Sequence, residues 1–357
     1  MLGPWLAATA LAWLLVGALL HVSARRAQTL AGYEACAALR QPVSAAPADR
    51  PWRIAVLGDL QRGVVDVPRA LTAHLAEEPA DLVIATGDVA IRGEAPWHGL
   101  VQRAFDRAGL ATPLRAVPGN HDLYPSRCRD DREGGPVYER LYGARSWGLE
   151  AGPALLVGLD TGAAWRADLE WPHAASWLAA RPDRPWLLFT HRPPWDFDAD
   201  GAPAYVDLAA LPDRWQARRP SLVVAGHLVG SVDVVRDGVR TIVNGDGGDV
   251  RGHGREPTWS LLRIEVAADG ACSVRTVTLP RSRDAAVARD VLALRMARSR
   301  RRLPGALLAA PWRLLLAPFG RNVPVHRPPL RRDYPTRDEA AAWLATSRPF
   351  ASLEVTS

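Results

Sequence analysis

Lysine is absent from this chain of 357 residues, and all 44 basic side chains are arginines. No physical argument requires a protein surface without lysine, so we interpret its absence as the bias of a GC-rich genome. Cysteine is scarce: Cys36, Cys128 and Cys272 are odd in number, far apart and without a Cys-x-x-Cys spacing. These residues therefore indicate neither a disulfide framework nor a zinc ribbon, and we expect buried or incidental thiols.

The remaining composition is that of a globular protein, with 48% apolar and 23% charged residues. The length allows one large domain or two ordinary ones. We find no internal repeat of fixed period. The net charge of +6 is uneven along the chain, because arginines concentrate in its last third.

The N-terminal segment 2–20 is uncharged and mostly apolar, and Arg25 and Arg26 follow it. As a helix it spans about 28 Å, close to the bilayer hydrocarbon thickness of about 30 Å. We expect residues 1–24 to form a single-pass transmembrane anchor, with the rest of the chain in the cytoplasm by the positive-inside rule. Two alternatives stay open. One is a signal peptide cleaved after Val22-Ser23-Ala24, which gives a secreted or periplasmic protein, and the other is a buried core helix.

Residues 25–50 favour a short helix followed by a linker rich in proline and alanine. Beyond the linker, short apolar runs end repeatedly in small or chemically active residues. Several runs are continuous rather than alternating, as expected for strands covered on both faces. The runs are 53–59, 81–88, 114–122, 154–161, 185–191, 221–227 and 239–248.

Helix-compatible stretches at 68–78 and 97–109 lie between the early runs. Strand-like segments follow at 259–266 and 272–279. This order predicts one α/β domain over residues 51–280, with two sheets sandwiched by helices.

Polar side chains with metal-binding chemistry follow five of these runs. Carboxylates, an amide oxygen and imidazoles are ligand types that suit divalent transition metals. Ligands placed after buried parallel strands converge at the carboxyl edge of the sheet. The five segments are Gly58-Asp59-Leu60-Gln61, Gly87-Asp88, Gly119-Asn120-His121-Asp122, Thr190-His191 and Gly226-His227-Leu228-Val229. A lone Gly-Asp or Gly-His pair is a weak signal, because such pairs are common in turns. The segment 119–122 after a strand is a stronger signal, and the ordered set of five predicts a metal site.

In order and spacing, these five segments resemble the calcineurin-like metallophosphoesterase family. Segments 138–143, 159–161 and 190–194 are similar to family segments as well. The resemblance covers residues 51–280 and implies a four-layer αββα sandwich, with a two-metal site that hydrolyses phosphoesters.

The resemblance also implies a role for each ligand. Asp88 would bridge the two metals, and Asn120, His191 and His227 would complete the first site. The second site would use Asp59, Asp88, a first-motif histidine and the last histidine of the fifth motif.

Both of those histidines are absent, and Gln61 and Val229 stand in their places. Purple acid phosphatases, a branch that also lacks the first one, supply a tyrosine where this chain has Ile91. Gln61 can offer a carbonyl oxygen, which is acceptable to manganese or magnesium but is a weaker ligand than imidazole for zinc or iron. His253 is a possible substitute ligand, and a solvated loop histidine is the alternative. We therefore expect one intact and one weakened site, holding one or two divalent ions, with Mn, Fe or Zn as the candidates.

The implied reaction is hydrolysis of a phosphomonoester or a phosphodiester. Paired metals would bind phosphate oxygens and generate a hydroxide near neutral pH. His121, oriented by Asp122, would protonate the leaving alkoxide, and a capping or core-edge role is its alternative. The weakened site leaves three outcomes open: a hydrolase with one tight and one loose metal, a mononuclear enzyme, or a catalytically silent homologue.

Residues 281–357 form the predicted C-terminal extension. Residues 282–302 favour a basic helix, and the leucine-rich run 303–320 is broken by prolines. We expect this extension to contact anionic headgroups at a membrane, with packing on the domain surface as the alternative. Nucleic acid is not an expected partner, because no recognition motif accompanies the charge. Thr336 to Glu339 resembles a capping box that opens a short last helix.

These features together favour a membrane-anchored metallophosphoesterase that acts on lipid-linked or nucleotide-linked phosphoesters. The rival hypothesis is a silent, membrane-tethered binding or regulatory protein, favoured by Gln61 and Val229. The oligomeric state does not follow from the sequence.

Overall fold

The computed structural model describes residues 3–47, 49–124, 134–162, 166–194, 214–215, 217–228, 231–245, 259–300, 351–353 and 355–356. Its helices are α1 (Gly3–Ala31), α2 (Ala37–Arg40), the 3-10 helix η1 (Gln61–Val65), α3 (Val67–Glu77), α4 (Ala95–Ala108), α5 (Asn120–Leu123), α6 (Gly134–Tyr142), α7 (Arg166–Ala179) and α9 (Ala285–Arg300). Its strands are β1 (Val43–Ser44), β2 (Trp52–Leu57), β3 (Leu82–Ala85), β4 (Leu114–Ala116), β5 (Trp147–Leu149), β6 (Leu155–Leu159), β7 (Trp186–Thr190), β8 (Leu222–Ala225), β9 (Ser231–Arg236), β10 (Val239–Asn244), β11 (Trp259–Val266), β12 (Cys272–Leu279), β13 (Ala351–Leu353) and β14 (Val355–Thr356).

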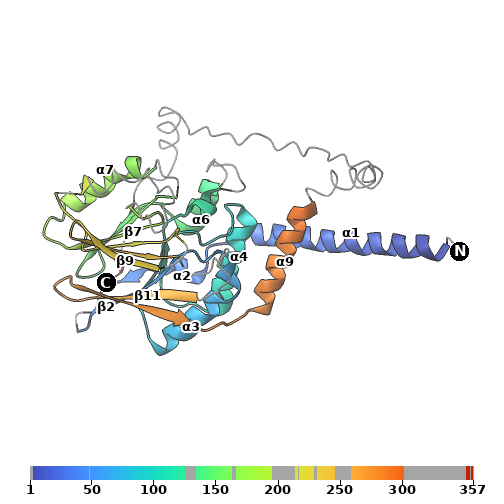
Figure 1. Ribbon diagram of the computed structural model, residues 1–357, viewed down its shortest axis with the longest axis horizontal. Coiled ribbons are helices and arrows are strands. Elements are labelled where there is room, and N and C mark those ends of the chain that lie inside the picture. The colour runs from blue at the N-terminus through green and yellow to red at the C-terminus, as the bar shows by residue number, and fades with distance from the viewer. Residues whose placement is uncertain are drawn as a thin grey trace.

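Two main sheets form the centre of the molecule (Figure 1). The five-stranded sheet has the order β12-β11-β2-β3-β4, and the seven-stranded sheet has the order β13-β5-β6-β7-β8-β10-β9. Strands β2, β3 and β4 run parallel, and so do β6, β7, β8 and β10. Strand β11 is antiparallel to both of its neighbours. Because parallel strands end at the same edge, each sheet gathers several loops along one side.

The side chains of β2 show how the layers are built. Ile54 and Val56 belong to an apolar cluster that fills the space between the two sheets. Ala55 and Leu57 point the other way, into a cluster shared with α3 and α4. This alternation follows from the two-residue period of a strand, and the continuous apolar run is needed because both faces are covered.

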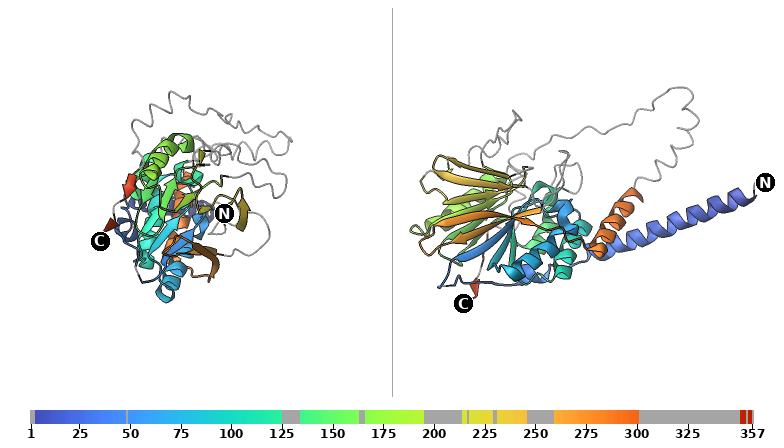
Figure 2. Two further views of the ribbon diagram at one scale, coloured as in Figure 1. Left: turned by 90° about the vertical axis from the view of Figure 1, so that its left-hand side faces the viewer. Right: turned by 60° about the horizontal axis from the view of Figure 1, so that its bottom comes forward.

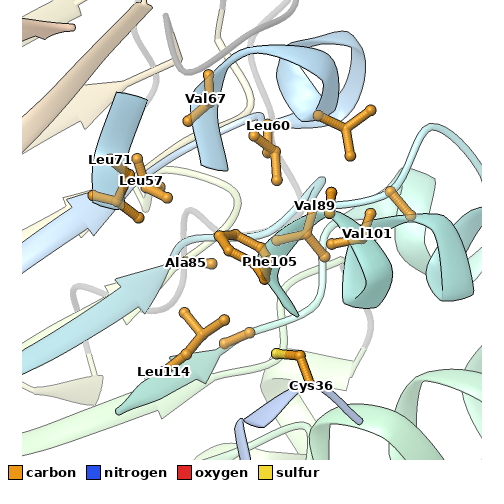
Figure 3. Packing of buried hydrophobic residues seen from close by; sticks show 14 of the residues in the cluster. Cys36, Leu57, Leu60, Val67, Leu71, Ala85, Val89, Val101, Phe105 and Leu114 are labelled. Carbon is orange, nitrogen blue, oxygen red and sulfur yellow. The ribbon is translucent and has the colours of Figure 1, made fainter. Parts of the chain in front are cut away.

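Helices cover the outer faces of both sheets. In Figure 3, Leu57 and Ala85 from the five-stranded sheet lie in the same cluster as Leu71 of α3 and Phe105 of α4. A third cluster joins the seven-stranded sheet to α7 through residues such as Trp171. The predicted mixed α/β fold with two sheets and flanking helices is therefore confirmed.

The first helix is longer than the sequence indicated. We expected an apolar segment followed by a separate helix, but α1 continues from Gly3 to Ala31 and projects away from the sheets (Figures 1 and 2). Its last turns pack against α4 and α9, with Leu30 fully buried and Arg26 ion-paired to Asp290 at 2.6 Å. Gly99 of α4 permits this packing, because a Cβ there would lie 1.7 Å from the Leu30 carbonyl oxygen.

Nearer its N-terminus, α1 exposes apolar side chains. They are Leu11, Leu14, Leu15, Val16, Leu19 and Val22. Among the residues that the structure describes, no helix combines the length and the apolar character needed to cross a membrane. The transmembrane anchor predicted for residues 1–24 is therefore not confirmed.

The described parts of the C-terminal extension pack on the body of the protein. Helix α9 lies within the predicted basic segment and packs against α1 and α4. Strand β13 then pairs in parallel with β5, and β14 pairs with β1. Leu353 of β13 packs against the cluster between the sheets. The apolar run 303–320, the capping box at 336–339 and Cys128 lie outside the described residues.

Candidate metal centre

The predicted site residues follow the ends of strands β2, β3, β4, β7 and β8. They are Asp59, Gln61, Asp88, Asn120, His121, Asp122, His191 and His227. Contacts across the two sheets show that these ends meet. His191 Nε2 lies 3.1 Å from Asn120 Oδ1, and the His227 backbone N–H donates to Asp59 Oδ2 at 2.7 Å. The fold therefore brings the predicted residues together at the edge where both sheets end.

Four of these residues have backbone angles that side chains rarely adopt. Asp59 (φ 49°), Gln61 (φ 29°), Asp88 (φ 52°) and His227 (φ 72°) have positive φ. In the described part of the chain, Asp237 (φ 50°), in the turn between β9 and β10, is the other non-glycine residue with this property. Such angles cost free energy and concentrate at functional sites, where the surrounding structure holds them.

Three side chains form a compact cluster of metal-binding groups. Asp88, His191 and His227 each offer one ligand atom, and these atoms lie within 4.8 Å of one another. His191 Nε2 is 3.4 Å from Asp88 Oδ1 and 2.9 Å from His227 Nδ1. With Asn120 Oδ1 beside it, the cluster contains all four ligands predicted for the intact site.

Hydrogen bonding fixes the tautomer of His191. Its Nδ1 lies 3.0 Å from the Thr86 carbonyl oxygen, which can only accept, so Nδ1 carries the proton and Nε2 presents a lone pair. Burial, together with the positive charge of Arg192, lowers the pKa of His191 to about 3, so the ring is neutral near neutral pH. Its lone pair therefore faces the oxygens of Asp88 and Asn120.

The second imidazole is also neutral. Burial, with a smaller contribution from His191, lowers the pKa of His227 to about 2. One carboxylate, one amide oxygen and two neutral imidazoles form a donor set that suits a divalent transition metal. The residues present at this position therefore fit a metal ion.

Sequence comparison identifies the family. A profile described as calcineurin-like phosphoesterase matches residues 53–231, half of the chain. The chain belongs to the calcineurin-like phosphoesterases. This family uses divalent metals to hydrolyse phosphoester bonds, in agreement with the donor set. No curated protein matches the chain.

Comparison with solved structures gives further matches. GAP50, the anchor in the inner membrane complex of Plasmodium, is 12% identical with a TM-score of 0.48, and the match covers 69% of this chain and 95% of that one. The purple acid phosphatase PPD1 from yellow lupin seeds is 16% identical with a TM-score of 0.49, covering 71% of this chain and 56% of that one. A dimetal phosphatase from Danio rerio is 16% identical with a TM-score of 0.48, and the match covers 65% of this chain and 100% of that one. Likenesses at this level carry no argument.

The residues that the resemblance assigns to a second metal ion are arranged differently from the cluster of this calcineurin-like phosphoesterase. Asp59 lies outside the three-residue cluster, and its Oδ2 accepts the backbone N–H of His227. The Gln61 amide nitrogen donates to Asp88 Oδ2 at 2.7 Å, whereas we expected its carbonyl oxygen to face a metal. The reason is that a carboxylate only accepts, so the amide turns its N–H toward it. Val229 and His253 lie outside the described residues.

The predicted general acid of this calcineurin-like phosphoesterase, His121, is oriented by a main-chain group. Its Nδ1 lies 2.9 Å from the Ile91 carbonyl oxygen, and its backbone N–H donates to Asp88 Oδ1 at 2.8 Å. From the sequence we expected the Asp122 side chain to orient the His121 ring. In the structure the ring is oriented by the Ile91 carbonyl oxygen instead. Neighbouring residues in the helical turn α5 point about 100° apart, so these two side chains face different surroundings.

Asp122 itself holds two loops in place. Its buried carboxylate accepts the backbone N–H groups of Gly119 (2.8 Å), Ala90 (2.8 Å) and Val89 (3.3 Å). Burial, and next the negative charge of Asp88, raise its pKa well above the usual value, and the three N–H groups act in the opposite direction. Asp122 thus links the loops after β3 and β4, which carry Asp88 and Asn120.

Two further residues beside the cluster were not among the predicted site residues. The buried Thr161 hydroxyl, after β6, accepts the backbone N–H groups of His191 (3.0 Å) and Arg192 (2.8 Å). The Arg192 guanidinium reaches His227, with Nη1 3.4 Å from Nε2. Both lie in segments that resemble the family, so those segments were the available signal.

His98 of α4 is a third contributor that the sequence did not indicate. Its Nε2 lies 2.9 Å from the Asp122 carbonyl oxygen, and its Nδ1 lies 3.3 Å from the Tyr142 hydroxyl. Burial lowers the pKa of His98 to about 4, which keeps the ring neutral. Through this contact α4 supports the turn that carries Asn120 and His121.

Proposed function

We propose that this chain is a metal-dependent phosphoesterase that hydrolyses a phosphomonoester or a phosphodiester near a membrane surface. The observation that carries the proposal is the neutral His191 ring, whose Nε2 lone pair faces the oxygens of Asp88 and Asn120. Acceptor atoms at these distances are stabilised by a cation among them. Family membership makes the reaction class a phosphoester hydrolysis.

The residues that would hold the ion are Asp88, Asn120, His191 and His227. When bound, a divalent ion supplies Lewis acidity toward the phosphoryl group and a hydroxide near neutral pH. The Asp88 and His191 side chains are buried, so few waters compete for their donor atoms. We infer Mn, Fe or Zn as the candidate ions, because imidazole nitrogen and carboxylate oxygen are both present.

His121 is the proposed general acid. The Ile91 carbonyl accepts from Nδ1 in both charge states of the ring, so Nε2 is the atom that gives and regains the proton. Donation from Nε2 to the leaving alkoxide stabilises the departing negative charge. General acid catalysis of this kind contributes a factor of about 10² to 10⁴ in rate.

Hydrolysis of bis-p-nitrophenyl phosphate and p-nitrophenyl phosphate tests this assignment. His121→Ala is expected to lower kcat at least ~100-fold while the variant still binds metal. His173→Ala, on the exposed face of α7, is the matched control and is expected to keep the wild-type rate. Equal rates for the wild type and His121→Ala, with metal supplied, would contradict the mechanism.

The membrane location is supported by helix α1. It projects from the sheets and exposes leucines, including Leu14 and Leu15, and Arg25 follows the apolar stretch. Such a helix fits attachment to a membrane surface. The proposed location of the body of the protein is the cytoplasm, where lipid-linked or nucleotide-linked phosphoesters are the proposed substrates.

Flotation with vesicles of phosphatidylcholine and phosphatidylglycerol tests the attachment. A Leu14→Glu, Leu15→Glu variant is expected to stay in the bottom fraction, whereas the wild type floats. Val235→Glu, an exposed apolar position on β9, serves as the control and should float. A wild-type protein that remains at the bottom would contradict the membrane location.

A second candidate function is a silent binding or regulatory protein on the same scaffold. The hydrogen bond from Gln61 to Asp88 favours it, because a family ligand has been replaced by a group that satisfies the carboxylate without metal. Metal content and turnover separate the two functions. A chain with neither bound metal nor activity supports the silent protein, and metal-dependent turnover excludes it.

A further inference from the structure

The two oxygens of Asp88 have different partners. Oδ1 faces the cluster, 3.4 Å from His191 Nε2, and it accepts the backbone N–H of His121. Oδ2 accepts a hydrogen bond from Gln61 Nε2 at 2.7 Å. In the family resemblance Asp88 would be shared by two cations. Here its second oxygen is directed at a neutral amide.

An amide N–H group cannot share that position with a cation. It carries a partial positive charge and no lone pair, so it repels a metal ion and cannot coordinate one. To act as a ligand, Gln61 would have to turn its carbonyl oxygen inward. That rotation removes the short hydrogen bond to Asp88 and leaves the buried carboxylate with one donor fewer, which is unfavourable.

The backbone around Gln61 restricts such a rearrangement. Gln61 is only 3% exposed, has a φ of 29° and begins the 3-10 helix η1. Its backbone N–H donates to the Asp88 carbonyl oxygen at 3.0 Å. The two residues are therefore joined through main chain and side chain, and the Gln61 side chain starts from a fixed point beside the carboxylate.

Asp59 has a donor of its own as well. Its Oδ2 accepts the His227 backbone N–H at 2.7 Å, and the side chain is buried. Two buried carboxylates at the same site favour a cation between them, because their negative charges repel each other. Here the Gln61 amide and the His227 backbone N–H each stabilise one carboxylate. The chain itself therefore supplies part of the electrostatic stabilisation that a second ion would provide.

We propose that the Gln61 side-chain amide takes the place of the second metal ion, so that the chain binds one divalent ion, at Asp88, Asn120, His191 and His227. This inference rests on the proposed function in one respect, that the cluster binds a metal. It departs from the two-metal arrangement that the resemblance implied.

Metal stoichiometry tests the inference without an activity assay. Full-length protein stripped of metal is loaded with excess Mn²⁺, passed through a desalting column and analysed by plasma mass spectrometry and electron paramagnetic resonance. We expect a ratio of about one Mn²⁺ per chain and the spectrum of an isolated ion. A ratio near two, with the spectrum of an exchange-coupled pair, overturns the inference.

Two variants at the same position sharpen the test, and thermal unfolding confirms that each is folded. Gln61→His supplies the missing imidazole, and we expect its ratio to rise toward two with a coupled signal. Gln61→Leu removes the amide donor without supplying a ligand, and we expect its ratio to stay near one. A Gln61→His protein that still binds a single ion overturns the role given to Gln61. A Gln61→Leu protein that binds two ions supports that role, because loss of the amide alone then opens the second position to an ion.

These outcomes separate the inference from the proposed function. One ion without turnover supports the inference and rejects the phosphoesterase. Two ions with turnover reject the inference and support the phosphoesterase. No bound ion rejects both.

Discussion

We expect loss of the Thr161 hydroxyl to lower the free energy of unfolding. Thr161→Val keeps a similar shape but removes the group that accepts the backbone N–H of His191 at 3.0 Å and of Arg192 at 2.8 Å. Thr161 and His191 are fully buried, so water cannot replace the hydroxyl at the His191 N–H. Leaving a buried donor unsatisfied costs about 1–3 kcal/mol. The Arg192 N–H lies in a half-buried residue and adds a smaller amount, so we expect a total loss of roughly 2–4 kcal/mol.

Urea unfolding followed by tryptophan fluorescence measures this loss. Thr161→Ser is the matched control, because it keeps the hydroxyl and removes only a methyl group, at a cost of about 1 kcal/mol. The two variants should have equal m values, since the surface exposed on unfolding is unchanged. The His191 backbone also sets the position of its ring, so Thr161→Val should weaken Mn²⁺ binding in titration calorimetry, and Thr161→Ser should not.

Free energies of unfolding of Thr161→Val and Thr161→Ser that agree within about 0.5 kcal/mol, the usual effect of a neutral substitution, would contradict this prediction. That result would mean that the two N–H groups find other acceptors. A destabilised Thr161→Val protein with unchanged metal affinity would confine the hydroxyl to a structural role.

Three further predictions concern neighbouring parts of the structure. Arg192→Gln removes the guanidinium beside the cluster, so we expect a higher KM for phosphoester substrates with a smaller change in kcat, measured by steady-state kinetics. His98 has its pKa lowered from 6.5 to about 4, so the stability that it contributes is complete above pH 6.5 and is lost as pH falls toward 4, by roughly 3 kcal/mol. Urea midpoints of the wild type should therefore fall over this range more than those of His98→Gln. Gly99→Ala places a Cβ 1.7 Å from the Leu30 carbonyl and should lower the melting temperature, whereas Gly17→Ala, with nothing within 4 Å, should not.

The local patterns were sufficient to predict the strands that carry the site. The apolar runs ending at Asp59, Asp88 and His191 are β2, β3 and β7, and β11 and β12 have the bounds expected from the sequence. Continuous apolar runs are informative here because both faces of these strands are covered.

Long-range pairing could not be predicted in the same way. Strands β13 and β14 together contain five residues, and their sequences Ala-Ser-Leu and Val-Thr carry no distinctive period. Their partners, β5 and β1, lie about 200 to 300 residues away along the chain, so only the assembled sheet edge defines the register.

Side-chain roles inside the site were the least predictable part. Gln61 carries both a donor and an acceptor, and its residue type does not decide which one faces Asp88. Asp122 follows His121 directly, so we expected a contact between their side chains. In a helical turn, however, adjacent side chains point about 100° apart. Such roles depend on rotation about one or two bonds, which the order of residues along a chain does not specify.

The candidate metal centre is held mainly by bonds to the main chain. His191 donates to the Thr86 carbonyl, His121 to the Ile91 carbonyl, and Asp122 accepts three backbone N–H groups. These bonds use the atoms that point away from the cluster, so the ligand atoms are positioned by the fold rather than by an ion. Replacement of Gln61 by histidine is therefore expected to change the number of bound ions while the residues of the cluster keep their positions.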